Sequence, residues 1–291
     1  MVGRVVVVTG ANSGIGKETA VGLATQGATT VLACRDQGRA ARAADEVRER
    51  AGSDDVHVVG LDLADLKTVT AAAEEITERW DRLDVLVNNA GGIWSRRELT
   101  ADGFEQTFGV NHLGHFLLTR LLLARLRASA PSRIVNLSSF GHHFAPFGMR
   151  FDDLQTERRY VALEVYSRSK LANLLFTREL ARRLQGSGVT ANAVHPGPVR
   201  SGFGMDGDLR GIEGLGNRLI RGLEISAEAG ARTSIFLASA PELAERSGGY
   251  YARSKPGHMS RQARSAESAE RLWRVSEELL EEAGFPVPPV F

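Results

Sequence analysis

The chain contains 291 residues, of which 43% are hydrophobic, and its formal net charge at pH 7 is +1. This length and apolar content suit one α/β domain with a large buried core, so residues 1–291 are predicted to form a single domain without a linker. The near-zero net charge argues against nucleic acid as a partner, and the one cysteine, Cys34, excludes an internal disulfide.

Apolar stretches are too short for a membrane span, because none reaches the ~18–20 residues that a transmembrane helix needs. The first apolar run begins within a few residues of Met1, which leaves no room for a signal peptide. We therefore expect a cytoplasmic protein without a transmembrane anchor.

Valine-rich apolar runs alternate with amphipathic stretches along the chain, which is the pattern of strands joined by crossover helices. The predicted strands span residues 5–9, 30–34, 56–61, 85–88, 134–137, 189–194 and 249–251. The predicted helices span residues 14–27, 37–51, 66–80, 103–128, 165–185 and 227–239. This alternation predicts a Rossmann-like α/β fold, with a doubly wound parallel sheet of about seven strands and helices on both faces. Ligands of such sheets bind at the carboxyl ends of the strands.

A glycine-rich turn follows the first predicted strand and opens the first helix, in the sequence Thr9-Gly10-Ala11-Asn12-Ser13-Gly14-Ile15-Gly16. Gly10 permits a sharp turn, Gly14 permits the backbone to approach a pyrophosphate, and Gly16 permits the helix to pack closely on the strand. The spacing departs from the general G-x-G-x-x-G fingerprint, so on the glycines alone a purely structural turn remains an alternative to a dinucleotide site.

The end of the second predicted strand bears on the choice of cofactor. An acidic residue there would bond the ribose hydroxyls of NAD, but this strand ends in Cys34-Arg35. A guanidinium can pair with a 2′-phosphate through charge-assisted hydrogen bonds, which predicts NADP(H) as the preferred cofactor. Asp36 follows at once, and a register shifted by one residue would point it at the ribose and favour NAD(H). Cys34 itself is expected to be a small core residue.

Tyr166 and Lys170 stand four residues apart in a predicted helix and therefore share one of its faces. A tyrosine titrates near ~10, so it exchanges protons poorly at neutral pH unless a nearby cation stabilises the phenolate. Lys170 is placed to be that cation. Taken alone, the spacing equally describes a partly exposed helix face.

The motif T-G-x-x-x-G-I-G together with Tyr-x-x-x-Lys resembles the short-chain dehydrogenase/reductase family. Further motifs follow in the family's order over residues 4–255, namely Asp62-Leu63, Asn88-Asn89-Ala90-Gly91, Asn111, Ser138-Ser139 and Pro196-Gly197. The segments A-C-R-D, V-N-H-L-G-H-F, S-K-L-A-N and V-H-P-G are most similar to the retinol-dehydrogenase and protochlorophyllide-reductase-like branch. The resemblance implies the strand order 3-2-1-4-5-6-7.

Four catalytic roles are implied by this resemblance. Tyr166 would be the general acid in carbonyl reduction and the general base in alcohol oxidation. Lys170 would lower the pKa of Tyr166 and hold the nicotinamide ribose. Ser139 would donate a hydrogen bond to the substrate oxygen, and Asn111, within the long helix 103–128, would bind a water that links Lys170 to solvent. Without the other motifs, Ser138-Ser139 would be interpreted as a polar strand end, and Asn111 would be interpreted as an ordinary polar residue of a helix.

The cofactor contacts are implied in the same way. Asp62 would bond the adenine amine, with a cap of the helix near residue 65 as its alternative role, and the turn after the fourth strand would lie under the adenosine ribose. Residues from Pro196 onward would wrap the nicotinamide, Ser201 standing where the family usually has threonine, and hydride would transfer from the 4-pro-S side. The predicted cofactor-binding residues are Gly10, Asn12, Ser13, Gly14, Ile15, Gly16, Arg35, Asp62, Leu63, Asn89, Ala90, Gly91, Tyr166, Lys170, Pro196, Gly197, Val199 and Ser201.

The segment 140–165 is long, aromatic and apolar, as in the retinol-dehydrogenase branch, and it favours a hydrophobic pocket. His142, Phe144 and Phe203 are its candidate substrate contacts, and the expected substrate is a hydrophobic aldehyde, ketone or alcohol. His142 and the adjacent His143 lack clustered cysteine or carboxylate ligands, so no metal site is predicted, and packing is the other role open to them.

Two C-terminal segments complete the prediction. The glycine-rich residues 202–225 are expected to form a mobile substrate lid, and residues 214–223 within it could instead lie on a membrane surface or a partner subunit. Residues 264–284 are expected to form an amphipathic helix that covers the core or a homo-oligomer interface.

Two functions from other classes remain open. A non-catalytic NADP(H)-binding regulatory protein could keep this fold after losing its chemistry, although the complete set of candidate catalytic residues argues against it. An epimerase that uses transient hydride transfer shares the Tyr–Lys pair, but that class generally has a larger C-terminal substrate domain.

Overall fold

The computed structural model describes residues 1–198 and 225–290, which surround one eight-stranded sheet of order β3-β2-β1-β4-β5-β6-β7-β8. The strands are β1 Val5–Thr9, β2 Thr29–Cys34, β3 Val56–Gly60, β4 Val85–Asn88, β5 Ser132–Leu137, β6 Val189–His195, β7 Tyr250–Ala252 and β8 Lys255–Pro256. All neighbours run parallel except β7 and β8. The predicted doubly wound fold and strand order are confirmed. The two-residue strand β8 is too short to show a periodic pattern and was missed.

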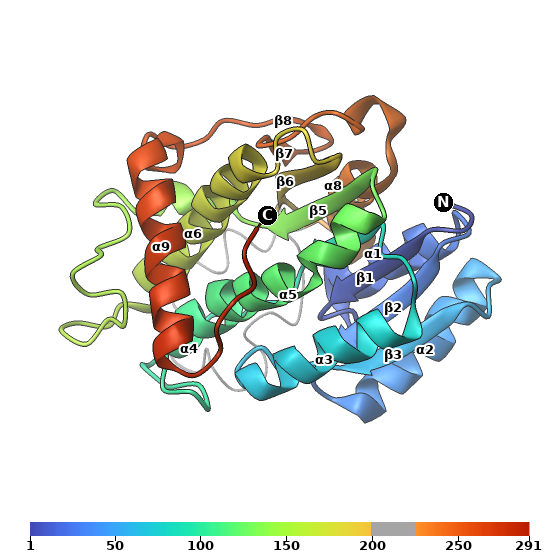
Figure 1. Ribbon diagram of the computed structural model, residues 1–291, viewed down its shortest axis with the longest axis horizontal. Helices are drawn as coiled ribbons and strands as arrows, with labels where there is room; N and C mark the ends of the chain where they lie inside the picture. The colour runs from blue at the N-terminus through green and yellow to red at the C-terminus, as the bar shows by residue number, and fades with distance from the viewer. Residues whose placement is uncertain (199–224, 291) are drawn as a thin grey trace.

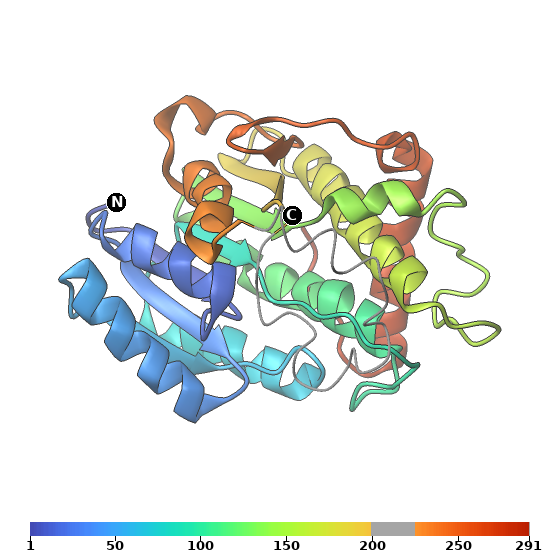
Figure 2. The same ribbon diagram turned by 180° about the vertical axis from the view of Figure 1, so that it is seen from behind.

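Helices cover both faces of the sheet. The longer ones are α1 Gly14–Ala24, α2 Gln37–Ala51, α3 Leu66–Arg79, α5 Gly114–Ala128, α6 Ala162–Arg183, α8 Ala227–Ser239 and α9 Ala266–Glu282. Helices α3, α5 and α6 lie on the face toward the viewer in Figure 1, with α9 packed outside α6, and all four share one apolar core with the sheet. Helices α1, α2 and α8 cover the other face, which Figure 2 shows, around a second core.

Local capping explains why several helix ends were predictable. The side chain of Asp36 accepts a hydrogen bond from the Arg39 amide at the start of α2, and Gly52 ends that helix with φ of 62°. Asp65 likewise accepts from the Lys67 amide at the start of α3. Such side-chain and glycine signals are visible in the sequence, so the predicted helix 37–51 coincides with α2.

The predicted helix 103–128 is wrong in two respects. It begins only at α4 Gln106–Phe108, because the Glu105 carboxylate accepts hydrogen bonds from the Thr107 and Phe108 amides and caps the helix there. It then widens into a π turn, Gly109–Leu113, before α5 begins. π turns occur mostly as single insertions in α-helices, frequently at functional sites, and this one carries Asn111.

Helix α9 lies within the predicted range 264–284 and is anchored by its aromatic residue. Trp273 is buried, with the Arg120 and Arg183 guanidinium carbons 4.8 and 4.5 Å from its ring centroid. Arg120 also pairs with Glu277 of α9. These contacts hold the C-terminal helix on α5 and α6.

Two further expectations concern segments near the C-terminus and membranes. The predicted lid 202–225, the segment 214–223 and the site residues Val199, Ser201 and Phe203 lie outside the described residues, apart from Ile225. Within residues 1–198 and 225–290, no helix has both the length and the apolar character needed to cross a membrane.

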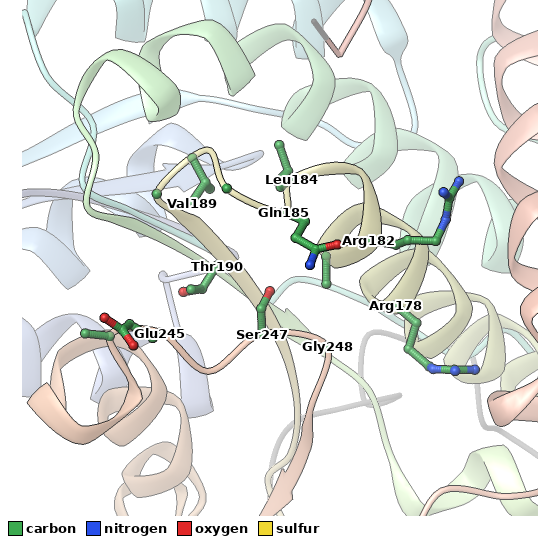
Figure 3. Close-up of a pocket in the computed structure, with 13 residues that line it drawn as sticks. Arg178, Arg182, Leu184, Gln185, Val189, Thr190, Glu245, Ser247 and Gly248 are labelled. Atoms are coloured by element: carbon green, nitrogen blue, oxygen red, sulfur yellow. The ribbon is translucent and has the colours of Figure 1, made fainter.

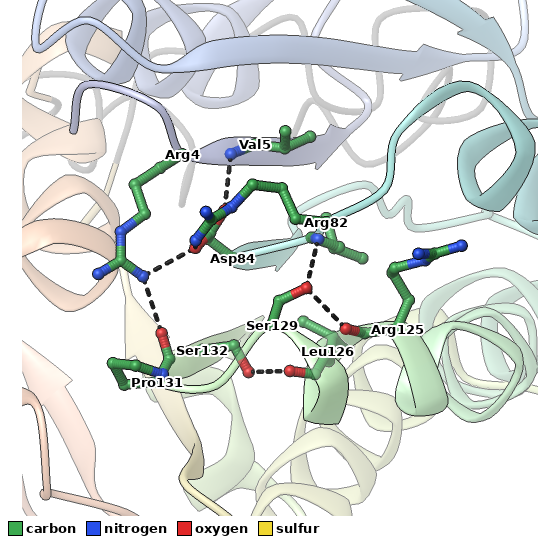
Figure 4. Close-up of polar contacts among 10 residues, drawn as sticks. Arg4, Val5, Arg82, Asp84, Arg125, Leu126, Ser129, Pro131 and Ser132 are labelled. Atoms are coloured by element: carbon green, nitrogen blue, oxygen red, sulfur yellow. Dashed lines mark hydrogen bonds and ion pairs between the residues drawn. The ribbon is translucent and has the colours of Figure 1, made fainter.

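The amino ends of β1 and β4 are joined by one buried carboxylate, Asp84, which is 1% exposed (Figure 4). It accepts hydrogen bonds from Arg82 (2.6 and 2.8 Å), Arg4 (2.7 Å) and the Val5 amide (2.9 Å). Burial alone would raise the pKa of the Asp84 carboxyl, but these hydrogen bonds outweigh burial and hold its pKa below the usual value.

Replacing Asp84 with alanine is expected to lower the free energy of unfolding by about 3 kcal/mol, because the buried Val5 amide loses its acceptor and the partly exposed Arg4 and Arg82 lose a charged partner. Because the folded-state pKa is depressed, the contribution of Asp84 is present at neutral pH and is lost as pH falls through that pKa. Urea unfolding at pH 7 measures the loss. Asp45→Ala, which removes an exposed partner of Arg48, is the matched control and should change stability by less than about 0.5 kcal/mol; an equal loss in both variants would contradict the assignment.

Candidate active site

Tyr166 and Lys170 lie one turn apart on α6 and face the carboxyl end of β5. The Lys170 Nζ atom is 5.5 Å from the centroid of the Tyr166 ring. The Tyr166 phenol forms a hydrogen bond with the Ser139 hydroxyl, which follows β5. The predicted catalytic tyrosine, lysine and serine are therefore brought together by α6 and β5.

The two serines after β5 have different environments. The Ser138 hydroxyl is buried and donates to the Lys170 carbonyl (2.8 Å), so it joins β5 to α6. The Ser139 hydroxyl accepts from the Gly141 amide (3.0 Å) and forms a hydrogen bond with the Tyr166 phenol. The geometry thus favours the second serine for contact with a substrate oxygen.

Asn111 clamps the loop that follows β4. Its Oδ1 accepts from the Gly92 amide (2.8 Å), and its Nδ2 donates to the Gly92 carbonyl and to Ser169 Oγ (both 2.9 Å). A Cβ on Gly91 would lie 2.8 Å from Asn111 Oδ1 and 3.3 Å from Lys170 Nζ, so this position requires glycine. Both hydrogens of the side-chain amide are engaged, so only the oxygen lone pairs of Asn111 that remain, on Oδ1 and on the main-chain carbonyl, could accept from the predicted water.

Lys170 is the most unusual group of the site. It is 1% exposed, and within the described parts of the chain its Nζ atom has no hydrogen-bond partner. Burial lowers the pKa of Lys170 to about 8. A buried ammonium without acceptors is unfavourable, so this atom fits a ligand that brings hydroxyl acceptors to it.

The pKa of the Tyr166 phenol is not lowered, as was expected from Lys170, but raised. Burial raises the pKa of the Tyr166 phenol to about 12, and the hydrogen bond with Ser139 opposes that rise. Desolvation therefore dominates over any effect of the lysine charge in this arrangement. The phenol is protonated at neutral pH and can serve as a proton donor.

The glycine turn after β1 combines packing with an open helix end. Gly10 has φ of 66°, and a Cβ on Gly16 would lie 2.5 Å from the Gly10 carbonyl oxygen, so Gly16 lets α1 approach β1. Ser13 is the N-cap of α1, yet its side chain caps no amide. The first amides of α1 therefore keep the unpaired donors that suit a phosphate.

The two charged residues after β2 differ in their contacts. Arg35 is exposed directly after the strand, whereas the Asp36 carboxylate is engaged in capping α2 (2.8 Å to the Arg39 amide). Cys34 is buried, and burial raises the pKa of its thiol to about 11, which agrees with a core role.

Asp62 and Leu63, after β3, have separate roles. Asp62 Oδ1 accepts from the Ala64 amide (3.0 Å), while Asp65 caps α3, so the alternative role proposed for Asp62 is filled by Asp65. The Leu63 side chain is buried, and a Cβ on Gly114 would lie 2.8 Å from the Leu63 carbonyl oxygen.

The candidate substrate contacts are not equivalent. His142 is buried, its Nδ1 pairs with the Ser139 carbonyl (2.6 Å) and its Nε2 accepts from the Ser260 amide (3.1 Å), which favours packing over substrate contact. Phe144 is 56% exposed.

Two of the predicted nicotinamide contacts, Pro196 and Gly197, directly follow β6, and Gly197 has φ of 93°.

Trp94 was not singled out from the sequence, although it lies beside the site. A Cβ on Gly92 would meet the Trp94 ring at 2.5 Å, and the Trp94 carbonyl accepts from the Tyr160 hydroxyl (2.8 Å). This contact joins the loop after β4 to the segment before α6. The sequence signal that could have identified Trp94 is its position, as an aromatic residue, soon after Asn89-Ala90-Gly91.

A cavity of about 600 Å³ lies elsewhere, at the amino end of β6 (Figure 3). Arg178 and Arg182 of α6, Thr190 of β6 and Ser247 contribute to its walls, and none of the candidate catalytic residues does.

No cluster of three or more His, Cys, Asp or Glu side chains suited to a metal occurs among residues 1–198 and 225–290.

Comparisons with known proteins find relatives over most of the chain. A family model described as short chain dehydrogenase matches residues 4–150. Retinol dehydrogenase 12 of Mus musculus is 50% identical over 278 residues, which cover 96% of this chain and 86% of that protein. A crystal structure of an uncharacterized protein from Mycobacterium paratuberculosis has a TM-score of 0.78 and 37% identity, covering 99% of this chain and 96% of that one. The Pseudomonas aeruginosa RhlG/NADP active-site complex has a TM-score of 0.68 and 26% identity, covering 87% and 95%.

Proposed function

Because this chain belongs to the short-chain dehydrogenase family, and within it to the retinol dehydrogenase branch, we propose that it is an NADP(H)-dependent oxidoreductase of apolar carbonyls and alcohols. Its similarity to this family and to retinol dehydrogenases supports an oxidoreductase that acts on the CH–OH group. The observation that carries the proposal is the buried Lys170 ammonium without a partner beside Tyr166, since a ribose would supply the acceptors it lacks.

The described residues fit a dinucleotide. The uncapped start of α1 after Ser13 suits the pyrophosphate, Gly91 has no side chain to crowd Lys170, and Lys170 suits the ribose hydroxyls. When bound, NADPH would supply the hydride. Val199 and Ser201, predicted to meet the nicotinamide, lie outside the described residues.

The chemistry of the side chains follows from their protonation. Tyr166 holds its phenolic proton at neutral pH and would donate it to the carbonyl oxygen as that oxygen becomes an alcohol. Ser139 would donate a second hydrogen bond to the same oxygen and stabilise its developing negative charge. Lys170 would carry the positive charge that eases return of a proton to Tyr166. In alcohol oxidation the same groups act in reverse.

Arg35 is proposed to select NADP(H) through the 2′-phosphate. Arg35→Ala is expected to lower kcat/KM for NADPH about 30-fold, because a charge-assisted pair is lost, and to change the value for NADH less than about threefold. Initial rates with both nucleotides measure this change. Arg42→Ala, at an exposed position farther along α2, is the matched control. An equal loss with both nucleotides, or a wild-type preference for NADH, would contradict the assignment.

The substrate class is proposed from the apolar segment 140–165 and from the names of the relatives. Phe140, Phe144 and Leu163 are each more than half exposed near the end of β5 and the start of α6. NADPH oxidation should be measured against medium- and long-chain aldehydes, apolar ketones and all-trans-retinal. Turnover confined to apolar members supports the proposal, and turnover of polar sugars or acids alone would contradict it.

The two alternative functions have distinct outcomes in that assay. A regulatory binding protein would bind NADPH and turn over none of the panel, whereas an epimerase would invert a stereocentre without net NADPH oxidation. The assembled set of Asn111, Ser139, Tyr166 and Lys170 argues against a binding protein without chemistry. The cytoplasmic location stays a prediction, which cell fractionation would test.

A further inference from the structure

The hydroxyl of Thr9, at the end of β1, is a junction between two loops of the site. Its Oγ1 accepts hydrogen bonds from the Asn89 amide (2.9 Å) and the Ala90 amide (3.0 Å). A hydroxyl has two lone pairs and one proton, so the proton remains for an acceptor. His115 Nε2 at 2.9 Å is a better acceptor than the Val87 carbonyl at 3.5 Å.

This pairing fixes the tautomer of His115. The ring is 3% exposed, and burial lowers the pKa of His115 to about 3, so the imidazole is neutral at physiological pH. Because Nε2 accepts from Thr9, the ring proton is on Nδ1, which lies 3.3 Å from the Asn111 carbonyl oxygen. His115 therefore donates to Asn111.

Asn111 connects this histidine to the catalytic helix. Its carbonyl lies in the π turn Gly109–Leu113, and its side chain holds Gly92 and Ser169. Ser169 Oγ donates in turn to the Tyr166 carbonyl (2.7 Å). A continuous set of buried and partly buried hydrogen bonds thus runs from the end of β1, through His115 and the π turn, to the turn of α6 that carries Tyr166.

We infer that His115 is a positioning residue, which holds the Asn111 π turn in register with the nucleotide-binding end of β1 and β4. This inference rests on the proposed function. His115 touches neither substrate nor nucleotide in this account. It acts through Asn111 on the loop at Gly91 and Gly92 and on the placement of Lys170 and Tyr166.

Three substitutions separate positioning from packing. His115→Leu should raise the Kd for NADPH about fivefold and lower kcat about tenfold, with KM for the carbonyl within about threefold, because the Asn111 carbonyl loses its donor. His115→Asn places an amide near the Nδ1 position and should restore both values to within about threefold of wild type. His115→Gln reaches the Nε2 position instead, so it keeps a partner for Thr9 and should not restore kcat.

The matched control is His112→Leu. His112 lies in the same π turn and is 1% exposed, but its Nε2 pairs with Ser276 of α9 (2.9 Å). This variant should lower Tm while the Kd for NADPH stays within about twofold.

NADPH fluorescence titration, Tm and steady-state kinetics on the full chain decide the question. Wild-type values of Kd and kcat in His115→Leu would overturn the inference. Equal losses of binding and kcat in His115→Asn and His115→Leu, in proportion to their loss of Tm, would overturn it as well. If the wild type reduces no carbonyl, the proposed function fails, while the Kd series across the His115 variants still tests the positioning role.

Discussion

Replacing Tyr166 with phenylalanine is expected to lower kcat for carbonyl reduction about 10³-fold, because a positioned general acid contributes on the order of 10²–10⁴-fold. Burial holds the pKa of the phenol at about 12, so the group is a proton donor throughout the neutral range. Phenylalanine keeps the ring and removes the proton. Initial rates of NADPH oxidation with a reactive apolar aldehyde measure the effect.

Nucleotide binding and a second tyrosine provide the controls for this variant. NADPH should bind Tyr166→Phe with a Kd within about threefold of wild type, since only one hydroxyl is lost. Tyr251, in β7, is 7% exposed and lies in the core on the α1, α2 and α8 face, so Tyr251→Phe should keep kcat within about threefold. Retained turnover in Tyr166→Phe would rule out the assigned proton donor.

Lys170→Met is expected to inactivate the enzyme and also to stabilise the free protein by about 3 kcal/mol at pH 7, since a buried ammonium without a partner is replaced by an apolar chain of similar length. Active sites often hold such unfavourable groups because function requires them. Denaturant unfolding without nucleotide measures the gain, and NADPH oxidation measures the loss of activity.

The pH dependence of that gain has a definite sign. Burial lowers the folded-state pKa of Lys170 to about 8, below the value of ~10.4 for an unfolded lysine. The unfolded wild type therefore binds more protons between these values, and wild-type stability rises with pH relative to the variant. The advantage of Lys170→Met should be full below pH 8 and should shrink above it. Lys67→Met, at an exposed position, is the control; a constant gain or a loss for Lys170→Met would contradict the buried-charge account.

Much of the fold was readable from the sequence because its signals are local. Alternating apolar runs gave the strands, and the predicted strands 5–9 and 85–88 coincide with β1 and β4. Asp36 and Gly52 bound α2 through capping interactions within a few residues. The resemblance to a family then identified Tyr166, Lys170, Ser139 and Asn111, which the structure brings together.

The remaining features depend on contacts between distant residues. Thr9 and His115 are 106 positions apart, so their hydrogen bond leaves no local pattern. The π turn at Asn111 interrupts a segment whose composition is ordinary for a helix, and neither caps nor periodicity reveal it. The pKa of Tyr166 was expected to be governed by Lys170, but burial governs it, and burial follows from tertiary packing.

Transfer of hydride to a carbonyl carbon is the central claim and can be followed directly with a label. NADPH carrying deuterium at the 4-pro-S position is incubated with an apolar aldehyde that the wild type reduces, and the alcohol is analysed by mass spectrometry. We predict that the alcohol carries one deuterium, that NADPH labelled at the 4-pro-R position gives unlabelled alcohol, and that Tyr166→Phe forms almost none. Alcohol without deuterium from either nucleotide, or bound NADPH with no alcohol from any apolar carbonyl, would contradict the account.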